Sequence, residues 1–343
     1  MRKFSYKILR LIFLCTIACF NSLFLSAQSV QTLSTPFNID VREISLTKWD
    51  SKEGISYQQV PGANLGATSF EVMDINHFAF LCNSSDEIII VNRTDSKVVR
   101  RINLPFSPRD FAYSKGSFFI LAEYQVFQYN QDGKEINKFS FPESYRGVER
   151  LIRFNNSTYI LLPSGNSLLI ESNGRSVESK ETEGWITQTG NFILTKLNGN
   201  STYSINVVRG NNIPYEKEFA CDKKVAGVYV IGSTDNRLVL DIQTFISENP
   251  ISVERNIVVI KLNKDGIGAV TAKIKVPDCY YVISNKDVLL NKNGTILNMI
   301  TAPQGIFVFN LTETISKSVQ DYPNFLVREK YHFNDHLIQN EKN

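Results

Sequence analysis

The chain has 343 residues, of which 43% are hydrophobic and 21% are charged, and its formal net charge is +3. These values are typical of a globular protein. The basic residues are spread along the chain, so the concentrated basic face that nucleic-acid binding requires is missing. We therefore expect no nucleic-acid partner.

The first 27 residues have the pattern of a secretory leader. Residues 2–10 carry positive charges, residues 11–19 are apolar, and Leu23–Ala27 ends in small residues before Gln28. This order predicts a signal peptide that is cut after about Ala27, and hence an exported protein, either periplasmic or extracellular.

Two other interpretations of the leader stay open. An uncleaved membrane anchor would need a longer apolar run, and Asn21 and Ser22 interrupt this one. A lipoprotein would use Cys19, but Thr16 stands where such a site usually has Leu. After signal cleavage we expect no membrane span.

Cleavage would leave three cysteines, Cys82, Cys221 and Cys279, at wide spacing. Neither a disulfide framework nor a paired zinc site follows from that arrangement. One disulfide plus one thiol, and three buried thiols, are both compatible with it.

The chain then begins with a polar tether over about Gln28–Pro36. Ile39–Trp49 alternates between apolar and polar residues and predicts an early strand that could pair with the end of the fold. Lys52–Gly66 is rich in Gly, Ser and Gln, which predicts a loop.

The clearest local signal is a hairpin at Phe127–Ile136. Two alternating runs flank Asp132-Gly133, and this dipeptide accepts the positive φ of a tight turn.

Similar figures recur along the chain as six units, each with short apolar runs separated by polar turns. The third-strand turns are marked by Asp95, Gly133, Gly174, Gly210, Gly266 and Glu313. A repeat of roughly 40 residues with four short strands is that of a β-propeller blade. We therefore predict an all-β fold, a six-bladed β-propeller with four-stranded antiparallel blades; an irregular pair of β-sandwiches is the alternative, but it would not need six similar units.

Each unit also contains a candidate innermost strand that would line the central channel. These are Phe70–Val72, Asp110–Tyr113, Arg150–Ile152, Trp185–Ile186, Val228–Val230 and Tyr281–Ile283. Unit five departs from the repeat by an inserted loop at about Ser247–Arg255, and insertions of this kind often lie on a binding face.

The turn chemistry resembles that of six-bladed propellers of the NHL and TolB-like kind, including exported bacterial propeller proteins. The matching residues are Tyr129–Lys134 with Pro142, Leu262–Gly266 with Pro277, and more loosely Ile170–Gly174. The resemblance covers about residues 66–320, and it implies ligand or partner binding on one face, often without catalysis. It leaves residues 28–65 as tether and ring-closing strand, and residues 321–343 as a polar tail.

Candidate site residues lie at the starts of the innermost strands and on neighbouring loops. Aromatic residues beside arginine on a rim bind sugars, peptides or protein partners, although packing between blades would also explain them. The expected ligand-binding residues are Glu71, Arg109, Asp110, Glu149, Arg150, Trp185, Tyr229 and Tyr281.

The sequence thus predicts an exported, non-catalytic binding module for a protein or glycan ligand, with no cofactor and no metal. The alternative is a propeller hydrolase or lyase with an axial divalent cation, held by the oxygens of Glu71, Asp110 and Glu149. The arginines nearby, Arg109, Arg150 and Arg153, would instead be expected to pair with these carboxylates.

Overall fold

The computed structural model describes residues 31–32, 39–49, 52–61, 63–145, 147–148, 150–210, 214–277, 281–291 and 293–313. The expected leader, Glu149, Cys279 and the polar tail lie outside these residues. The described residues form strands, turns and loops without a helix, and no membrane-crossing helix occurs among them.

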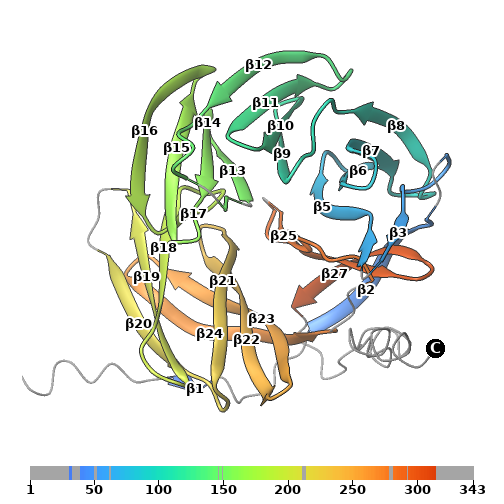
Figure 1. The fold of residues 1–343 in the computed structure, drawn as a ribbon. Coiled ribbons are helices and arrows are strands. Elements are labelled where there is room, and N and C mark those ends of the chain that lie inside the picture. The colour runs from blue at the N-terminus through green and yellow to red at the C-terminus, as the bar shows by residue number, and fades with distance from the viewer. Residues whose placement is uncertain are drawn as a thin grey trace, which may run out of the picture.

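The strands form six antiparallel blades arranged in a ring (Figure 1), as the sequence predicts. From the innermost strand outward, the first two blades are β5 (Ala67–Val72), β6 (His77–Cys82), β7 (Glu87–Asn92) and β8 (Val98–Asn103), then β9 (Asp110–Ser114), β10 (Ser117–Ala122), β11 (Gln125–Asn130) and β12 (Glu135–Ser140). The next two are β13 (Arg150–Phe154), β14 (Ser157–Leu161), β15 (Asn166–Ser172) and β16 (Arg175–Glu183), then β17 (Trp185–Ile186), β18 (Asn191–Leu197), β19 (Thr202–Arg209) and β20 (Tyr215–Ala220). Blade five is β21 (Val225–Ser233), β22 (Arg237–Glu248), β23 (Ile251–Asn263) and β24 (Gly266–Val276), and blade six is β25 (Val288–Leu290), β26 (Ile296–Ala302), β27 (Gly305–Glu313) and β2 (Ile39–Thr47).

The early strand closes the ring. β2 pairs antiparallel with β27, from Ile39 opposite Glu313 to Thr47 opposite Ile306, so a segment that precedes all the other blade strands supplies the outermost strand of the last blade. The indole Nε1 of Trp49 then donates to the carbonyl of Ala302 at 2.7 Å. Two residues of the expected tether, Gln31 and Thr32, form β1, which pairs in parallel with β20 at the edge of blade four.

The local turn signal at Asp132-Gly133 forms the β11–β12 hairpin. Gly133 has a φ of 82°, and the amide of Asn130 donates to the carbonyl of Lys134 at 2.9 Å. A positive φ costs glycine little because it has no Cβ, so the turn stays tight.

The apolar core is divided into clusters between neighbouring blades. Side chains alternate along each strand, so Leu238 and Leu240 face blade four while Val239 faces blade six. Neither face of a blade could be buried without a neighbour, and the ring buries both.

Two expectations about the strands are wrong. Tyr281–Ile283 is not the sixth innermost strand, because Val282 is held by the hydroxyl of Thr301 and the strand forms later, as β25. The inserted loop in unit five is instead the extension of β22 and β23, which pair up to Glu248 opposite Ile251.

The expected loop at Lys52–Gly66 also contains a small hairpin, β3 (Gln58–Val60) with β4 (Ala63–Leu65). We call the end of the ring with the β22–β23 turn the hairpin end. The opposite end, where the first and second strands of each blade connect, as between Val72 and His77, is called the turn end.

Candidate functional site

Two pockets open at the two ends of the central channel. The pocket at the hairpin end has a volume of about 620 Å³, and the pocket at the turn end has about 470 Å³. Arg150, Ile231, Lys286 and Val288 line both of them. These side chains therefore stand between the two pockets.

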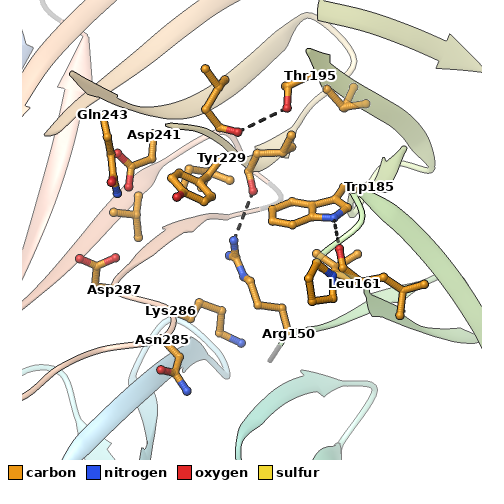
Figure 2. Close-up of a pocket in the computed structure, with 18 of the residues that line it drawn as sticks. Arg150, Leu161, Trp185, Thr195, Tyr229, Asp241, Gln243, Asn285, Lys286 and Asp287 are labelled. Atoms are coloured by element: carbon orange, nitrogen blue, oxygen red, sulfur yellow. Dashed lines mark hydrogen bonds between the residues drawn. The ribbon is translucent and has the colours of Figure 1, made fainter. Parts of the chain in front are cut away.

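Aromatic side chains form one wall of the hairpin-end pocket (Figure 2). Trp185 begins β17, and its indole Nε1 donates to the carbonyl of Leu162 at 3.1 Å. The guanidinium of Arg150 lies 5.9 Å from the Trp185 ring and donates to the carbonyl of Val230 at 3.3 Å. Tyr229 is 42% exposed, so it remains available to a ligand.

Gly227 sets the position of the Tyr229 ring. A Cβ at residue 227 would come within 2.7 Å of this ring. In the β21–β22 register Gly227 lies opposite Gln243, and Tyr229 lies opposite Asp241. The absent side chain therefore leaves the space over which Tyr229 leans, next to the polar residues of β22.

An ion-paired group, the arginine cluster, also lines the hairpin-end pocket. It consists of Arg255, Asp241 and Asp287. Two nitrogens of Arg255 donate to Asp241 Oδ2, Nε at 3.0 Å and one terminal nitrogen at 2.6 Å. The same guanidinium donates to both oxygens of Asp287, at 2.7 and 3.2 Å.

One oxygen of this cluster is left over. Asp241 is 4% exposed, and its Oδ1 atom accepts no hydrogen bond from any described residue. Burial raises the pKa of Asp241, and the attraction of Arg255 offsets this only in part. A buried acceptor without a donor costs free energy that a ligand could recover.

The lysine cluster lies deeper and joins three blades. The ammonium of Lys286 contacts Glu71 Oε1 at 2.9 Å and Asp110 Oδ1 at 3.0 Å, and it also donates to the carbonyl of Phe111. The other oxygen of Asp110 accepts from the amide of Leu151 at 2.9 Å. Burial alone would lower the pKa of Lys286, but the two carboxylates outweigh it and the pKa is raised.

One ammonium cannot neutralise two buried carboxylates. Burial raises the pKa of Glu71 despite its contact with Lys286. We therefore assign the energetic cost of the excess negative charge to Glu71.

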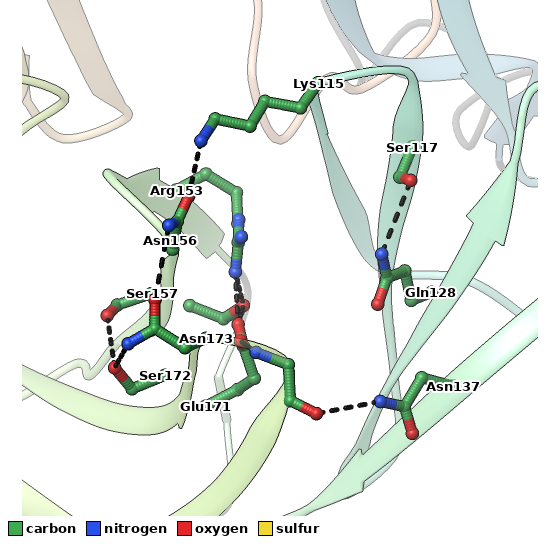
Figure 3. A network of polar contacts seen from close by, with 12 residues as sticks. Lys115, Ser117, Gln128, Asn137, Arg153, Asn156, Ser157, Glu171, Ser172 and Asn173 are labelled. Carbon is green, nitrogen blue, oxygen red and sulfur yellow. Dashed lines mark hydrogen bonds and ion pairs between the residues drawn. The ribbon is translucent and has the colours of Figure 1, made fainter.

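At the turn end most polar groups pair with one another (Figure 3), although Nε of Arg153 is a buried donor without an acceptor among the described residues. Arg153 pairs with Glu171, whose carboxylate also accepts from the hydroxyl of Thr158 at 2.6 Å. Lys115 donates to Asn156, which in turn donates to Asn173 at 3.2 Å. The Lys115–Asn156 bond connects blades two and three, and the other contacts lie within blade three.

The eight expected site residues are divided among several places. Arg150, Trp185 and Tyr229 come together in the hairpin-end pocket, and Glu71 lines the turn-end pocket. Asp110 is fully buried in the lysine cluster.

The remaining three lie elsewhere. Arg109 is exposed and donates to the carbonyl of Val148 at 3.4 Å. Tyr281 stacks on Tyr57 with ring centroids 5.4 Å apart, and it lines neither pocket. Glu149 lies outside the described residues.

The expected pairing of Glu71 and Asp110 with arginine is also wrong, because their cation is Lys286. Sequence reasoning misses this residue, because it predicts the sixth innermost strand at Tyr281–Ile283 and the strand is β25. It misses Asp241 and Arg255 as well. The signal for those two is a lone acid in the apolar run Leu238–Ile242, and a lone arginine just before Ile257–Ile260.

No group of three or more His, Cys, Asp or Glu side chains in the described parts of the chain is arranged to hold a metal ion. Cys82 and Cys221 are buried free thiols, and burial raises the pKa of Cys221 to about 11. Neither thiol is therefore a reactive nucleophile at neutral pH.

Solved structures share this propeller fold. A presumed exported protein of Bacteroides fragilis matches with a TM-score of 0.52 at 9% identity, over 83% of this chain and 99% of that chain. A functionally unknown protein from Desulfotomaculum acetoxidans matches with a TM-score of 0.48 at 15% identity, over 84% and 95% of the two chains.

A virginiamycin B lyase from Staphylococcus aureus matches with a TM-score of 0.42 at 12% identity, over 80% of this chain and 99% of that chain. At these identities the likeness concerns the fold alone. No protein-family model and no curated protein matches the sequence.

Proposed function

We propose that the protein is an exported, non-catalytic binding protein that takes a protein or glycan ligand at the hairpin-end pocket. The observation that carries this proposal is the meeting of Trp185, Tyr229 and Arg150 at one mouth of the channel. Exposed aromatic residues beside arginine are the side chains that contribute most to binding energy at recognition sites.

The size and shape of the pocket support a ligand site. Ligand pockets commonly have volumes of about 300–1,000 Å³ and combine aromatic walls with a few placed polar groups. The pocket of about 620 Å³ has aromatic walls, and its lining includes Asp241, which has one buried oxygen without a donor.

The alternative, a hydrolase or lyase with an axial divalent cation, finds less support in the same residues. Glu71 and Asp110 already share the ammonium of Lys286. A divalent cation at this position would have to displace a buried lysine from two carboxylates.

The test of binding uses glycan and peptide arrays probed with the purified protein. We expect one class of probe to bind, and we expect Trp185→Ala combined with Tyr229→Ala to weaken this binding at least tenfold. Tyr113→Ala, at the turn end, is the matched control and should bind as the wild type does. Binding that the pocket variant retains in full, or conversion of the bound probe into product, would refute the proposal.

The exported location is supported by the pattern of residues 1–27. Mass spectrometry of the protein from its native host should find a mature chain that begins at about Gln28. A lipid-modified Cys19 would favour the lipoprotein alternative, and an intact leader on the cell-associated protein would contradict cleavage.

A further inference from the structure

The chemistry of the hairpin-end pocket narrows the class of ligand. Three polar groups in its lining have hydrogen-bonding capacity that the described residues leave unused. Asp241 Oδ1 is a buried acceptor without a donor, Nε of Arg150 is a buried donor without an acceptor, and the Gln243 amide makes no side-chain hydrogen bond with the described residues.

The charges in the pocket disfavour ligands that carry a net charge of either sign. An anion that approached Arg150 would also meet the carboxylates of Asp241 and Asp287, and the third cation of the lining, Lys286, is already paired with Glu71 and Asp110. A cation that approached Asp241 would meet Arg150 and Arg255, and Arg255 is already paired with two carboxylates. Like charges at close range in a partly buried site are unfavourable.

A hydroxyl group fits both open partners, because it donates one hydrogen bond and accepts others. A ring that carries several hydroxyls can therefore donate to Asp241 Oδ1, accept from Arg150 and exchange either kind of bond with Gln243. Its C–H faces are apolar and can pack on the rings of Trp185 and Tyr229.

We propose that the hairpin-end pocket binds a neutral sugar ring, with one hydroxyl donating to Asp241 Oδ1 and with the ring face against Trp185 and Tyr229. This inference rests on the proposed function and names its ligand class. It makes Asp241 the residue that determines specificity, although this residue is nearly hidden from solvent.

The test uses tryptophan fluorescence, since the chain has 2 tryptophans. The probes are methyl pyranosides of glucose, mannose, galactose, fucose, xylose and N-acetylglucosamine, each with its monodeoxy analogues. We expect at least one neutral glycoside to change the emission saturably at millimolar concentration or below, and we expect Trp185→Phe to abolish this change. Asp241→Asn should weaken the affinity about ten- to hundredfold, which is the effect of losing a hydrogen bond to a charged group.

The deoxy analogues identify the contact with Asp241. One deoxy analogue should bind the wild type about as weakly as the parent glycoside binds Asp241→Asn. In Asp241→Asn the same deoxy change should reduce the affinity little further, because both changes remove the same hydrogen bond. Arg150→Gln should also weaken binding, whereas Arg109→Gln, an exposed arginine outside the pocket, should leave it unchanged. Tyr229→Ala provides a second pocket variant that leaves the ion pairs intact, should Asp241→Asn not fold.

Several results would overturn the inference. The first is that no neutral glycoside changes the emission of Trp185 at millimolar concentration. The second is an affinity that neither Asp241→Asn nor Arg150→Gln alters. Binding of a peptide, or only of glucosamine or glucuronic acid, that still depends on Trp185 would reject the neutral sugar and leave the proposed function standing, whereas a failure of every probe in both arrays would reject both.

Discussion

The lysine cluster and the arginine cluster each hold one cation between two carboxylates, and Lys286 and Asp287, adjacent in the sequence, give one member to each. In the lysine cluster the compact ammonium is only 4% exposed and contacts both carboxylates and a backbone carbonyl. In the arginine cluster the planar guanidinium uses its nitrogens on Asp287 and on one oxygen of Asp241, and the other oxygen remains open.

This difference suggests two roles: the lysine cluster stabilises the fold, and the arginine cluster can also take part in ligand recognition. Charged groups whose partners all belong to the protein can hold blades together, but they have no unused hydrogen-bonding capacity for a ligand. A cluster in the lining of a pocket that keeps one acceptor without a donor can accept a hydrogen bond from a ligand.

Among the substitutions that test this comparison, Lys286→Met is expected to lower the free energy of unfolding most. The substitution leaves Glu71 and Asp110 buried without a cation, and removing one partner of a buried ion pair typically costs about 3–5 kcal/mol. Urea denaturation measures the loss. Lys115→Met, a surface control, should change stability by less than about 0.5 kcal/mol, and a similarly small loss for Lys286→Met would show that the lysine cluster is not a structural element.

Arg255→Met should have the next largest effect on the free energy of unfolding, about 2–3 kcal/mol, since the carboxylate of Asp287 that it leaves behind is partly exposed to water. The side chain of Asp287 is 17% exposed, whereas that of Asp110 is fully buried. Denaturation in parallel with Lys286→Met makes the comparison direct. A greater loss for Arg255→Met would reverse the assignment of the two clusters.

Glu71→Gln tests the excess negative charge of the lysine cluster through the pH dependence of the free energy of unfolding. The raised pKa of Glu71 means that the folded state binds a proton more readily than the unfolded state does, for which the usual value is 4.5. The stability that this group contributes is therefore fully present below pH 4.5 and is lost as the pH rises through the folded-state pKa. The wild type should show this decline, at most about 1.4 kcal/mol per pH unit, and Glu71→Gln should lack it.

Asp241 adds a decline of the same sign to both proteins, so the difference between the two curves isolates Glu71. Thermal unfolding from pH 4 to pH 8 provides the curves. Parallel curves would contradict the assignment of the cost to Glu71.

The smallest effect is expected from shortening the β22–β23 hairpin. Replacing residues 245–253 by Asn-Gly removes Ile246 and Ile251, which are 59% and 78% exposed, and should cost less than about 1 kcal/mol. Affinity for a ligand of the hairpin-end pocket should stay within threefold of the wild type. A large loss of affinity with stability preserved would extend the site beyond the pocket onto the hairpin.

Local signals made most of the fold predictable. An Asp-Gly turn between alternating runs specifies its own hairpin, and repeating this figure six times specifies the blades. The ring-closing strand could be anticipated too, because an unpaired alternating run near the start needs a partner. Blade six is harder to predict, since Tyr281–Val282 has the composition of a strand, but Tyr281 stacks on Tyr57 and the backbone of Val282 bonds to the hydroxyl of Thr301.

The site was only partly predictable. Trp185, Tyr229 and Arg150 stand at or within innermost strands, where the repeat itself points. Lys286 contacts Glu71 across 215 positions of the sequence, and no local sequence pattern predicts a contact between residues so far apart in the chain. Arg255 lies at the end of an expected loop that is in fact part of a continuous pair of strands, and Asp241 stands in an apolar run that predicts only a strand.

The position of β2 has a consequence for synthesis of the chain. A ribosome makes Ile39–Thr47 before any blade, but the strand that this segment must join, Gly305–Glu313, emerges only after five blades have been made. Until then the segment is an orphan edge that could join a neighbouring chain instead. In newly made molecules, strand exchange between two chains therefore competes with closure of the ring by β2 and β27. A chain that ends before residue 305 lacks β27 and cannot close its ring in this way.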